Sequence, residues 1–305
     1  MKNNKPKIII ITGVTSVGKT STSVKLARLV GGEIISADSI QVYKGFDIGS
    51  AKVTSEEMQN IPHHLIDFQN PMEEYSAGTF AEMADNKIQE IINRKNTPII
   101  VGGTGLYISA LLFPFDTIAK RNEKYRASLQ QILLSENGKE KLYNMLNDID
   151  NITAKSLNIN QTDRIIRALE IYHETGIKKS ELCRENKSKY DYLLIVLCRD
   201  RGEVYKAIDS RVDDMVKNGL IDEVKNLVKM GFHDAPAMKG IGYKEILAFL
   251  DGKIDKDTAI NLIKQRTRNY AKRQITFFKK MPNVKLVQYN NFDEIKKLTD
   301  KFLGE

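Results

Sequence analysis

The chain has 305 residues, of which 41% are hydrophobic and 28% charged, a composition typical of a folded globular protein with one large or two modest domains. No apolar run reaches the roughly 18–20 residues that a membrane-spanning helix needs, so we expect no membrane partner. Met1–Lys7 lacks the apolar stretch of a signal peptide, and Cys183 and Cys198 are too few for a disulfide framework or a zinc site, so we expect a cytoplasmic protein.

The charge is unevenly distributed along the chain. The 47 Lys and Arg residues exceed the 39 Asp and Glu residues by eight. Between Thr258 and Phe292 there are eight basic residues and no acidic one, so this segment accounts for the whole excess. Such a segment indicates a polyanionic partner. The alternative is a solvated basic helix on an ordinary surface.

The N-terminal part alternates predicted strands and helices. The predicted strands are Lys7–Thr12, Glu33–Ala37 and Pro98–Val101, and the predicted helices are Lys19–Val30, Phe80–Asn93 and Leu106–Leu112. Strands that alternate with helices predict a parallel sheet covered by helices on both faces.

From about Asp116 the periodicity becomes helical, until the apolar run Tyr192–Cys198 predicts a late strand that rejoins the sheet. We therefore assign residues 1–117 and 191–305 to an α/β core and residues 118–190 to a helical insertion. Further long helices are expected at Val204–Met230, Tyr243–Leu250 and Ala259–Lys279.

Residues 13–20 match the phosphate-binding pattern G-x-x-x-x-G-K-[ST] at every fixed position. The motif follows a predicted strand and opens a predicted helix, where backbone N–H groups and the helix N-terminus attract phosphate oxygens. Lys19 adds a point charge, and the Thr20 hydroxyl can bind Mg²⁺. The fold class is therefore α/β: a P-loop-containing parallel sheet with a helical insertion and a helical C-terminal segment. We expect a di- or triphosphate to be bound by Gly13, Val14, Thr15, Ser16, Val17, Gly18, Lys19 and Thr20.

One part of a P-loop hydrolase is missing. Such an enzyme usually has an acid after an apolar strand to hold Mg²⁺, but Pro98–Val101 runs into Gly102-Gly103-Thr104-Gly105. The acid nearest the loop along the predicted sheet edge is Asp38. It can be a metal ligand, a general base or a helix cap; the flanking Ser36 and Ser39 favour the general base.

Seven further blocks occur in one order along the chain. They are Ser36–Tyr43, Asp47–Lys52, Pro62–Asp67, Gly102–Tyr107, Asp163–Glu170, Gly240–Lys244 and Lys272–Thr276. Together with the P-loop, the ordered set resembles the tRNA dimethylallyltransferases of the bacterial type, which are prenyltransferases. A zinc finger of the eukaryotic type would need more cysteines than the two present.

The resemblance implies transfer of the dimethylallyl group from dimethylallyl diphosphate to N6 of the adenosine on the 3′ side of the anticodon in tRNA. The P-loop then holds the diphosphate of the donor, and the hydrolytic acid is missing because no water is activated. Mg²⁺ is the implied cofactor, and we expect a monomer whose insertion contacts the anticodon stem-loop.

The resemblance also implies roles for four residues. Asp38 is the base for the N6 proton, Lys19 and Arg211 neutralise the diphosphate, and Thr104 lies beside the reaction centre. On the residues alone, Arg211 would be a surface helical arginine and Thr104 a turn residue.

The tRNA contacts come partly from the same blocks and partly from the basic helix. On the residues alone, the arginines of the insertion would form a solvated helical face. The assigned contacts are Asp38, Ser39, Ile40, Gln41, Thr104, Arg126, Asp163, Arg164, Ile165, Ile166, Arg167, Gly240, Ile241, Gly242, Tyr243, Lys244, Glu245, Lys272, Arg273, Gln274, Ile275, Thr276, Phe277, Phe278 and Lys279.

The predicted helix Ala259–Lys279 has an apolar spine with basic flanks when it is projected at 100° per residue. One basic stripe contains Lys264, Arg268 and Lys272, and the other contains Arg266, Arg273 and Lys280. Gln274 falls on the apolar arc, where an unpaired amide is unfavourable, so either a base edge or a backbone group must satisfy it.

Three departures from the family and three rival functions remain. Phe277 stands where members usually have Trp, Asn160-Gln161 replaces Asn-Asp, and Val14 replaces a common proline. The rivals are an adenylate isopentenyltransferase, a P-loop nucleotide kinase and a non-catalytic RNA-binding protein. The first two have no use for the helical insertion or the acid-free C-terminal segment. In the third, Asp38 would be dispensable, so Asp38→Ala distinguishes it.

Overall fold

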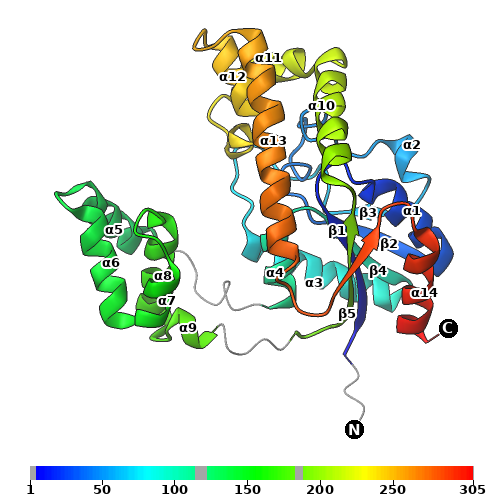
Figure 1. Cartoon of the computed structure of the whole chain (residues 1–305), viewed down its shortest axis with the longest axis horizontal. Helices are drawn as coiled ribbons and strands as arrows, with labels where there is room; N and C mark the ends of the chain where they lie inside the picture. The colour runs from blue at the N-terminus through cyan, green and yellow to red at the C-terminus, as the bar shows by residue number, and fades with distance from the viewer. Residues whose placement is uncertain (1–4, 114–121, 183–187, 305) are drawn as a thin grey trace. The chain divides into compact units, whose positions relative to one another are not determined.

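The computed structural model describes residues 5–113, 122–182 and 188–304 (Figure 1). The chain divides into two compact units, one formed by Met1–Leu111 with Tyr190–Glu305 and the other by Leu112–Lys189. The boundary that we expected between residues 117 and 118 lies outside the described residues, as does Cys183.

Unit 1 contains a six-stranded sheet of order β3-β2-β4-β1-β5-β6, in which every neighbouring pair is parallel. The strands are β1 (Lys7–Gly13), β2 (Gly32–Ser36), β3 (His63–His64), β4 (Thr97–Gly102), β5 (Asp191–Cys198) and β6 (Val284–Gln288). The α/β fold class is confirmed. We did not predict β3 and β6, because β3 has two residues and β6 is largely exposed at the sheet edge.

The apolar strand residues alternate between the two faces of the sheet. Ile9 and Ile11 join a core with α1 (Lys19–Val30) and α14 (Phe292–Leu303), whereas α3 (Ala77–Asn93) packs on β2 and β4 and buries Phe80 and Ile88. Because both faces are covered, the central strands are apolar through their middle, as Ile8–Ile11 and Leu193–Leu197 show.

The C-terminal part of unit 1 is helical. Its helices are α10 (Arg201–Lys217), α11 (Leu220–Lys229), the 3₁₀ turn η2 (Pro236–Lys239), α12 (Tyr243–Leu250) and α13 (Lys256–Phe278); two more, α2 (Ser55–Met58) and α4 (Gly105–Leu112), lie earlier in the chain. The single helix that we predicted over Val204–Met230 is wrong. It breaks at Gly219, whose φ of 98° is a left-handed conformation that ends α10 and starts α11.

Unit 2 is a small helical assembly. Its helices are α5 (Glu123–Leu134), α6 (Gly138–Ile149), α7 (Asn151–Ser156), α8 (Thr162–Thr175) and α9 (Lys179–Leu182). The apolar faces of α5, α6 and α8 meet in a core of their own around Leu129, Leu142 and Leu169. Across both units, none of the described helices is long and apolar enough to cross a membrane.

Candidate active site

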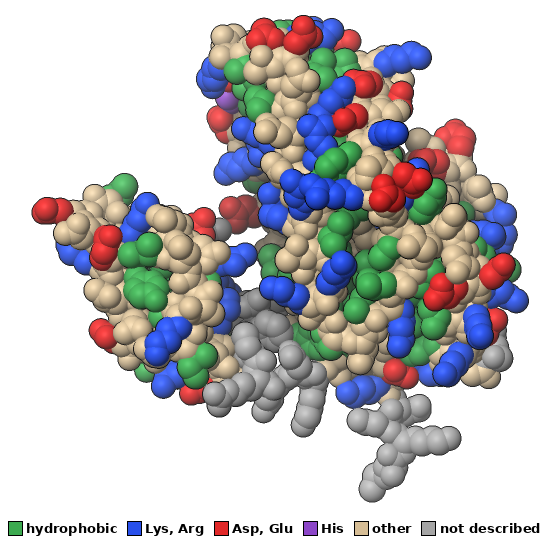
Figure 2. Space-filling view, in the orientation of Figure 1, with side chains coloured by type: hydrophobic (Ala, Val, Ile, Leu, Met, Phe, Trp, Pro, Cys, Tyr) green, Lys and Arg blue, Asp and Glu red, His purple; other side chains and the backbone are tan. Residues whose placement is uncertain are grey.

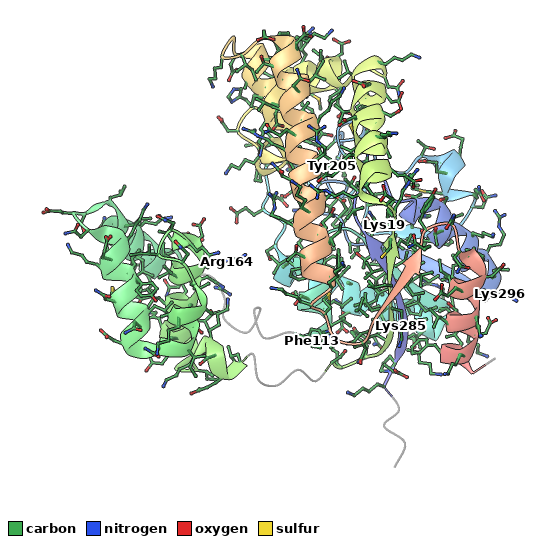
Figure 3. The ribbon with its side chains drawn as sticks, viewed as in Figure 1. Lys19, Phe113, Arg164, Tyr205, Lys285 and Lys296 are labelled. Atoms are coloured by element: carbon green, nitrogen blue, oxygen red, sulfur yellow. The ribbon has the colours of Figure 1, made fainter. Side chains whose placement is uncertain are left out.

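The P-loop joins β1 to α1 at the carboxyl edge of the sheet. Gly18 caps α1 with a φ of 94°, and the Lys19 ammonium donates to the carbonyls of Gly13 and Val14 at 3.2 and 2.8 Å (Figure 3). The Ser16 hydroxyl is buried and has no hydrogen-bond partner among the described residues. Since a buried hydroxyl without a partner is unfavourable, this loop is suited to accept phosphate oxygens.

Two residues from distant helices hold the P-loop in place at Thr15. The Arg211 guanidinium, on α10, donates to Thr15 Oγ1 at 3.1 Å and to the Ser50 carbonyl at 3.2 Å. Gln274, on α13, accepts from the Thr15 N–H at 3.1 Å and donates to the Gly103 carbonyl at 2.9 Å. The sequence left two partners open for the Gln274 amide, and the structure selects backbone groups, not a base edge.

The electrostatic environment of Lys19 is adapted to an anion. Burial, together with the nearby Arg211 guanidinium, lowers the pKa of Lys19 to about 8, while Asp38 acts in the opposite direction. Burial also lowers the pKa of Arg211, again opposed by Asp38. These three side chains therefore share one site, in which two desolvated cations outnumber one carboxylate.

Asp38 follows β2 at the same edge of the sheet. Its Oδ1 accepts from the N–H groups of Ile40 and Gln41 at 2.9 and 3.2 Å, so it stabilises the turn that follows the strand. Oδ2 forms no hydrogen bond within the part of the chain that the structure describes. One oxygen therefore orients the carboxylate, and the other is left to accept a proton.

The Gly102–Gly105 segment lets three elements approach one another closely. A Cβ on Gly102 would collide with the Ala37 carbonyl, and one on Gly103 with the Gln274 amide. Thr104 lies in this turn close to Tyr270 of α13, whose hydroxyl donates to the Gly103 carbonyl at 3.4 Å. Burial and the nearby Asp38 raise the pKa of Tyr270 to about 12, which makes Tyr270 a site residue that the sequence reading missed.

Glu223 is a second residue that the sequence analysis missed, and it connects the blocks Asp47–Lys52 and Gly240–Lys244. Glu223, on α11, accepts from the N–H groups of Asp47, Ile48 and Gly49 at 3.1, 2.6 and 3.0 Å, and from the Tyr243 hydroxyl at 2.8 Å. Tyr243 is fully buried, and a Cβ on Gly49 would collide with its ring. The role of Glu223 gave no signal in the sequence, because its backbone partners lie about 175 residues away.

Six of the side chains assigned to tRNA contact are buried in the protein instead. In unit 2, Ile165 and Ile166 belong to the core around α8. In unit 1, Tyr243 contacts Glu223 of α11, Glu245 pairs with Arg266 of α13, and Gln274 contacts the P-loop. These residues are Ile165, Ile166, Tyr243, Glu245, Gln274 and Phe278, and their assignment to tRNA contact stays a prediction. The helical periodicity of Ile165 and Ile166 already indicated a core position.

The other assigned residues are at least partly exposed in their own units. They are Asp38, Ser39, Ile40, Gln41, Thr104, Arg126, Asp163, Arg164, Arg167, Ile241, Lys244, Lys272, Arg273, Ile275, Thr276, Phe277 and Lys279. Gly240 is partly exposed and Gly242 is buried. Arg126 is only 18% exposed and donates to the fully buried Glu170 at 2.9 Å.

The comparisons with known proteins agree with this geometry. A family model described as IPP transferase matches residues 41–281. The chain is 45% identical over 303 residues to a tRNA dimethylallyltransferase of Carboxydothermus hydrogenoformans, covering 98% of this chain and 97% of that protein.

Solved structures are similar over nearly the whole chain. The tRNA isopentenylpyrophosphate transferase of Bacillus halodurans is 41% identical with a TM-score of 0.72, covering 98% of this chain and 95% of its own. A eukaryotic dimethylallyltransferase acting on tRNA is 32% identical with a TM-score of 0.80, covering 97% of this chain and 77% of its own. The resemblance inferred from the sequence is thus confirmed, and the chain belongs to the IPP transferase family.

Proposed function

We propose that this protein is a tRNA dimethylallyltransferase. It transfers the dimethylallyl group of dimethylallyl diphosphate to N6 of the adenosine on the 3′ side of the anticodon and releases diphosphate. The observation that carries the proposal is the convergence of Lys19, Arg211 and Asp38 at one P-loop edge. Relatives named for this activity, at up to 45% identity over nearly the full length, support it.

The same groups account for the chemistry. The N6 lone pair of adenine attacks the allylic carbon while the bond from that carbon to the diphosphate oxygen breaks. The N6 proton passes to Asp38 Oδ2, and the electron pair of the broken bond leaves with the diphosphate. Lys19 and Arg211 stabilise the charge that develops on this leaving group.

Mg²⁺ fits the site as a partner of the donor. The described residues contain no group of three His, Cys, Asp or Glu side chains that could hold a metal alone. Mg²⁺ is commonly held by few protein ligands together with substrate phosphates, and the Thr20 hydroxyl in the first turn of α1 can supply one. When bound, the ion would neutralise charge on the diphosphate.

The remaining parts of the proposal concern the RNA and its setting. We propose that tRNA contacts the exposed basic residues Lys272 and Arg273 on α13, and Arg164 on α8 of the insertion. We also propose a monomer in the cytoplasm, because one chain supplies every assigned group and unmodified tRNA is found there.

The test is an assay with Mg²⁺, dimethylallyl diphosphate and unmodified tRNA, alongside AMP as the competing acceptor. We expect one anticodon-loop adenosine to gain the mass of a dimethylallyl group. Asp38→Asn keeps an oxygen for the Ile40 and Gln41 amides but cannot take the proton, so kcat should fall by about 10²–10⁴-fold.

The matched control is Asp293→Asn, which removes an exposed carboxylate on α14. Prenylated AMP without prenylated tRNA would instead show a free-nucleotide enzyme. No reaction with either acceptor would favour a nucleotide kinase. Full activity of Asp38→Asn would show that the protein is a transferase but that Asp38 is not its base.

A further inference from the structure

Two arginines lie on tyrosine rings just beyond the carboxyl end of β5. The Arg199 guanidinium carbon is 4.5 Å from the centroid of the Tyr289 ring, and that of Arg201 is 5.2 Å from the centroid of the Tyr205 ring. The Arg201 Nε also donates to the Tyr205 hydroxyl oxygen at 3.0 Å. Each arginine is therefore held in a defined position by an aromatic ring.

A residue of α13 joins this group. The Lys272 ammonium lies near the Tyr205 hydroxyl, whose pKa it helps Arg201 to lower, and Figure 3 labels Tyr205 beside α13. We call the five residues Arg199, Arg201, Tyr205, Lys272 and Tyr289 the α10 surface. None of them has a role in the reaction described above, apart from the tRNA contact assigned to Lys272.

The charge of the α10 surface is only partly balanced. Arg199 donates to Glu203 at 3.0 Å, and Asp200 is used as the cap of α10 through the N–H groups of Gly202 and Glu203. Arg201 and Lys272 have no carboxylate partner among the described residues. Two cations therefore remain free to bind an anion, next to the partly exposed rings of Tyr205 and Tyr289.

The position of this surface connects it to the active site. Gly13, the first P-loop residue, pairs with Leu197 in the sheet, so Arg199 follows at the same edge only two residues later. Lys272 precedes Gln274, which holds the P-loop, by two residues on α13. Figure 2 shows basic side chains gathered along the visible face of α13, and the α10 surface continues that face onto α10.

We propose that the α10 surface binds the phosphodiester backbone of the tRNA substrate, with Arg201 as its principal phosphate contact. This inference rests on the proposed function. Tyr205 occupies the Nε of Arg201 and fixes the plane of the guanidinium, which leaves both terminal nitrogens to face a phosphate as a fork. Tyr205 is thus a positioning residue for Arg201.

The test is Arg201→Ala, a change at an exposed residue in the first turn of α10. We expect the KM for tRNA to rise roughly threefold to tenfold near physiological salt, while the KM for dimethylallyl diphosphate and the kcat at saturating tRNA stay unchanged. The slope of log affinity for tRNA against log salt should fall in magnitude by about one. Lys296→Ala, which removes an exposed cation on α14, is the matched control and should change neither value.

Tyr205→Phe separates positioning from charge, because it keeps the ring and removes the oxygen that holds Arg201. It should raise the KM for tRNA about twofold, and Arg201→Ala should add little more in the double variant.

If Arg201→Ala leaves the KM for tRNA and the salt slope unchanged, the inference is wrong even though the wild type transfers the dimethylallyl group. A rise in the donor KM instead would assign Arg201 to the P-loop. Failure of the wild type to prenylate tRNA would remove the proposed function itself.

Discussion

In the middle of α13, Lys264, Arg266 and Arg268 each pair with a carboxylate of a neighbouring helix, whereas from Lys272 onward no basic residue has such a partner among the described residues. Lys264 pairs with Asp213 and Arg268 with Asp209, both on α10, at 2.6 and 2.5 Å. The first region therefore uses its charge to hold the helix on the protein.

The unpaired region is also the one that contacts the P-loop through Gln274 and packs Phe277 against Gly105. Both basic stripes that we projected from the sequence run along the helix. In each stripe, the residues before Lys272 are neutralised by carboxylates, and within the described part of the chain the others are not. A count of basic residues thus overestimates the charge that is available to RNA. The variants below test this difference between the paired and unpaired regions.

The largest effect is expected from Gln274→Ala in the unpaired region. The change leaves the Thr15 N–H without its partner, and leaves the Gly103 carbonyl with only the Tyr270 hydroxyl at 3.4 Å, which costs about 1–3 kcal/mol. Since the P-loop then loses one of its two fixed contacts, kcat/KM for the donor should fall about a hundredfold. Gln265→Ala, at an exposed position of the paired region, is the control. Unchanged donor kinetics in Gln274→Ala would mean that Arg211 alone holds the loop.

Arg266→Met should affect stability rather than RNA binding. Glu245 is fully buried and would keep only the Gly242 N–H, at 2.7 Å, and a distant Lys244 as partners. Removing one member of a fully buried ion pair lowers the free energy of unfolding by about 3–5 kcal/mol. The Arg266 side chain is 45% exposed, so water weakens this pair. We therefore expect a smaller loss, of about 2 kcal/mol. Urea denaturation measures it. A higher KM for tRNA without a loss of stability would show that this pair opens toward RNA.

Lys272→Ala and Lys264→Ala make the same chemical change in the two regions. Lys272 has no carboxylate partner, so its removal should raise the KM for tRNA about threefold to fivefold and reduce the salt dependence of binding. Lys264 is already neutralised by Asp213, so its removal should leave the KM nearly unchanged. Filter binding of tRNA at several salt concentrations checks both. Equal effects of the two variants would contradict the comparison.

The parts of the molecule that sequence could predict are those that depend on local patterns. The β-branched run of β1, the P-loop and the start of α1 are specified by neighbouring residues, and the structure places α1 at the predicted bounds. The partners of Gln274, Glu223 and Arg266 depend on residues that are far away in the chain. No periodicity predicts such contacts, because the fold brings them together.

Two other differences between the sequence-based prediction and the structure can be explained from the sequence. Gly219 is the only glycine between Arg201 and Met230 other than Gly202, and the helical pattern across it concealed a left-handed residue. The buried Ile165 and Ile166 had the apolar character of core residues, but the block resemblance led us to assign them to RNA. A family block therefore groups core residues with exposed ones, and the structure shows which side chains of the block are buried.

An effect of similar size concerns Lys19, which, like the unpaired region of α13, has no carboxylate partner among the described residues. Because the pKa of Lys19 is about 8 without a donor, its ammonium loses its proton as the pH rises through 8 and the attraction for diphosphate is lost. At pH 8.5 about one quarter of the molecules keep the charge, so the affinity for inorganic diphosphate should be about fourfold weaker than well below pH 8. Calorimetry from pH 7 to 9 measures this. In Lys19→Arg the charge persists across the range, so its affinity, whatever its value at pH 7, should stay level. A level profile in the wild type would place the pKa of Lys19 near its ordinary value, and burial would then not separate this lysine from the exposed cations of α13.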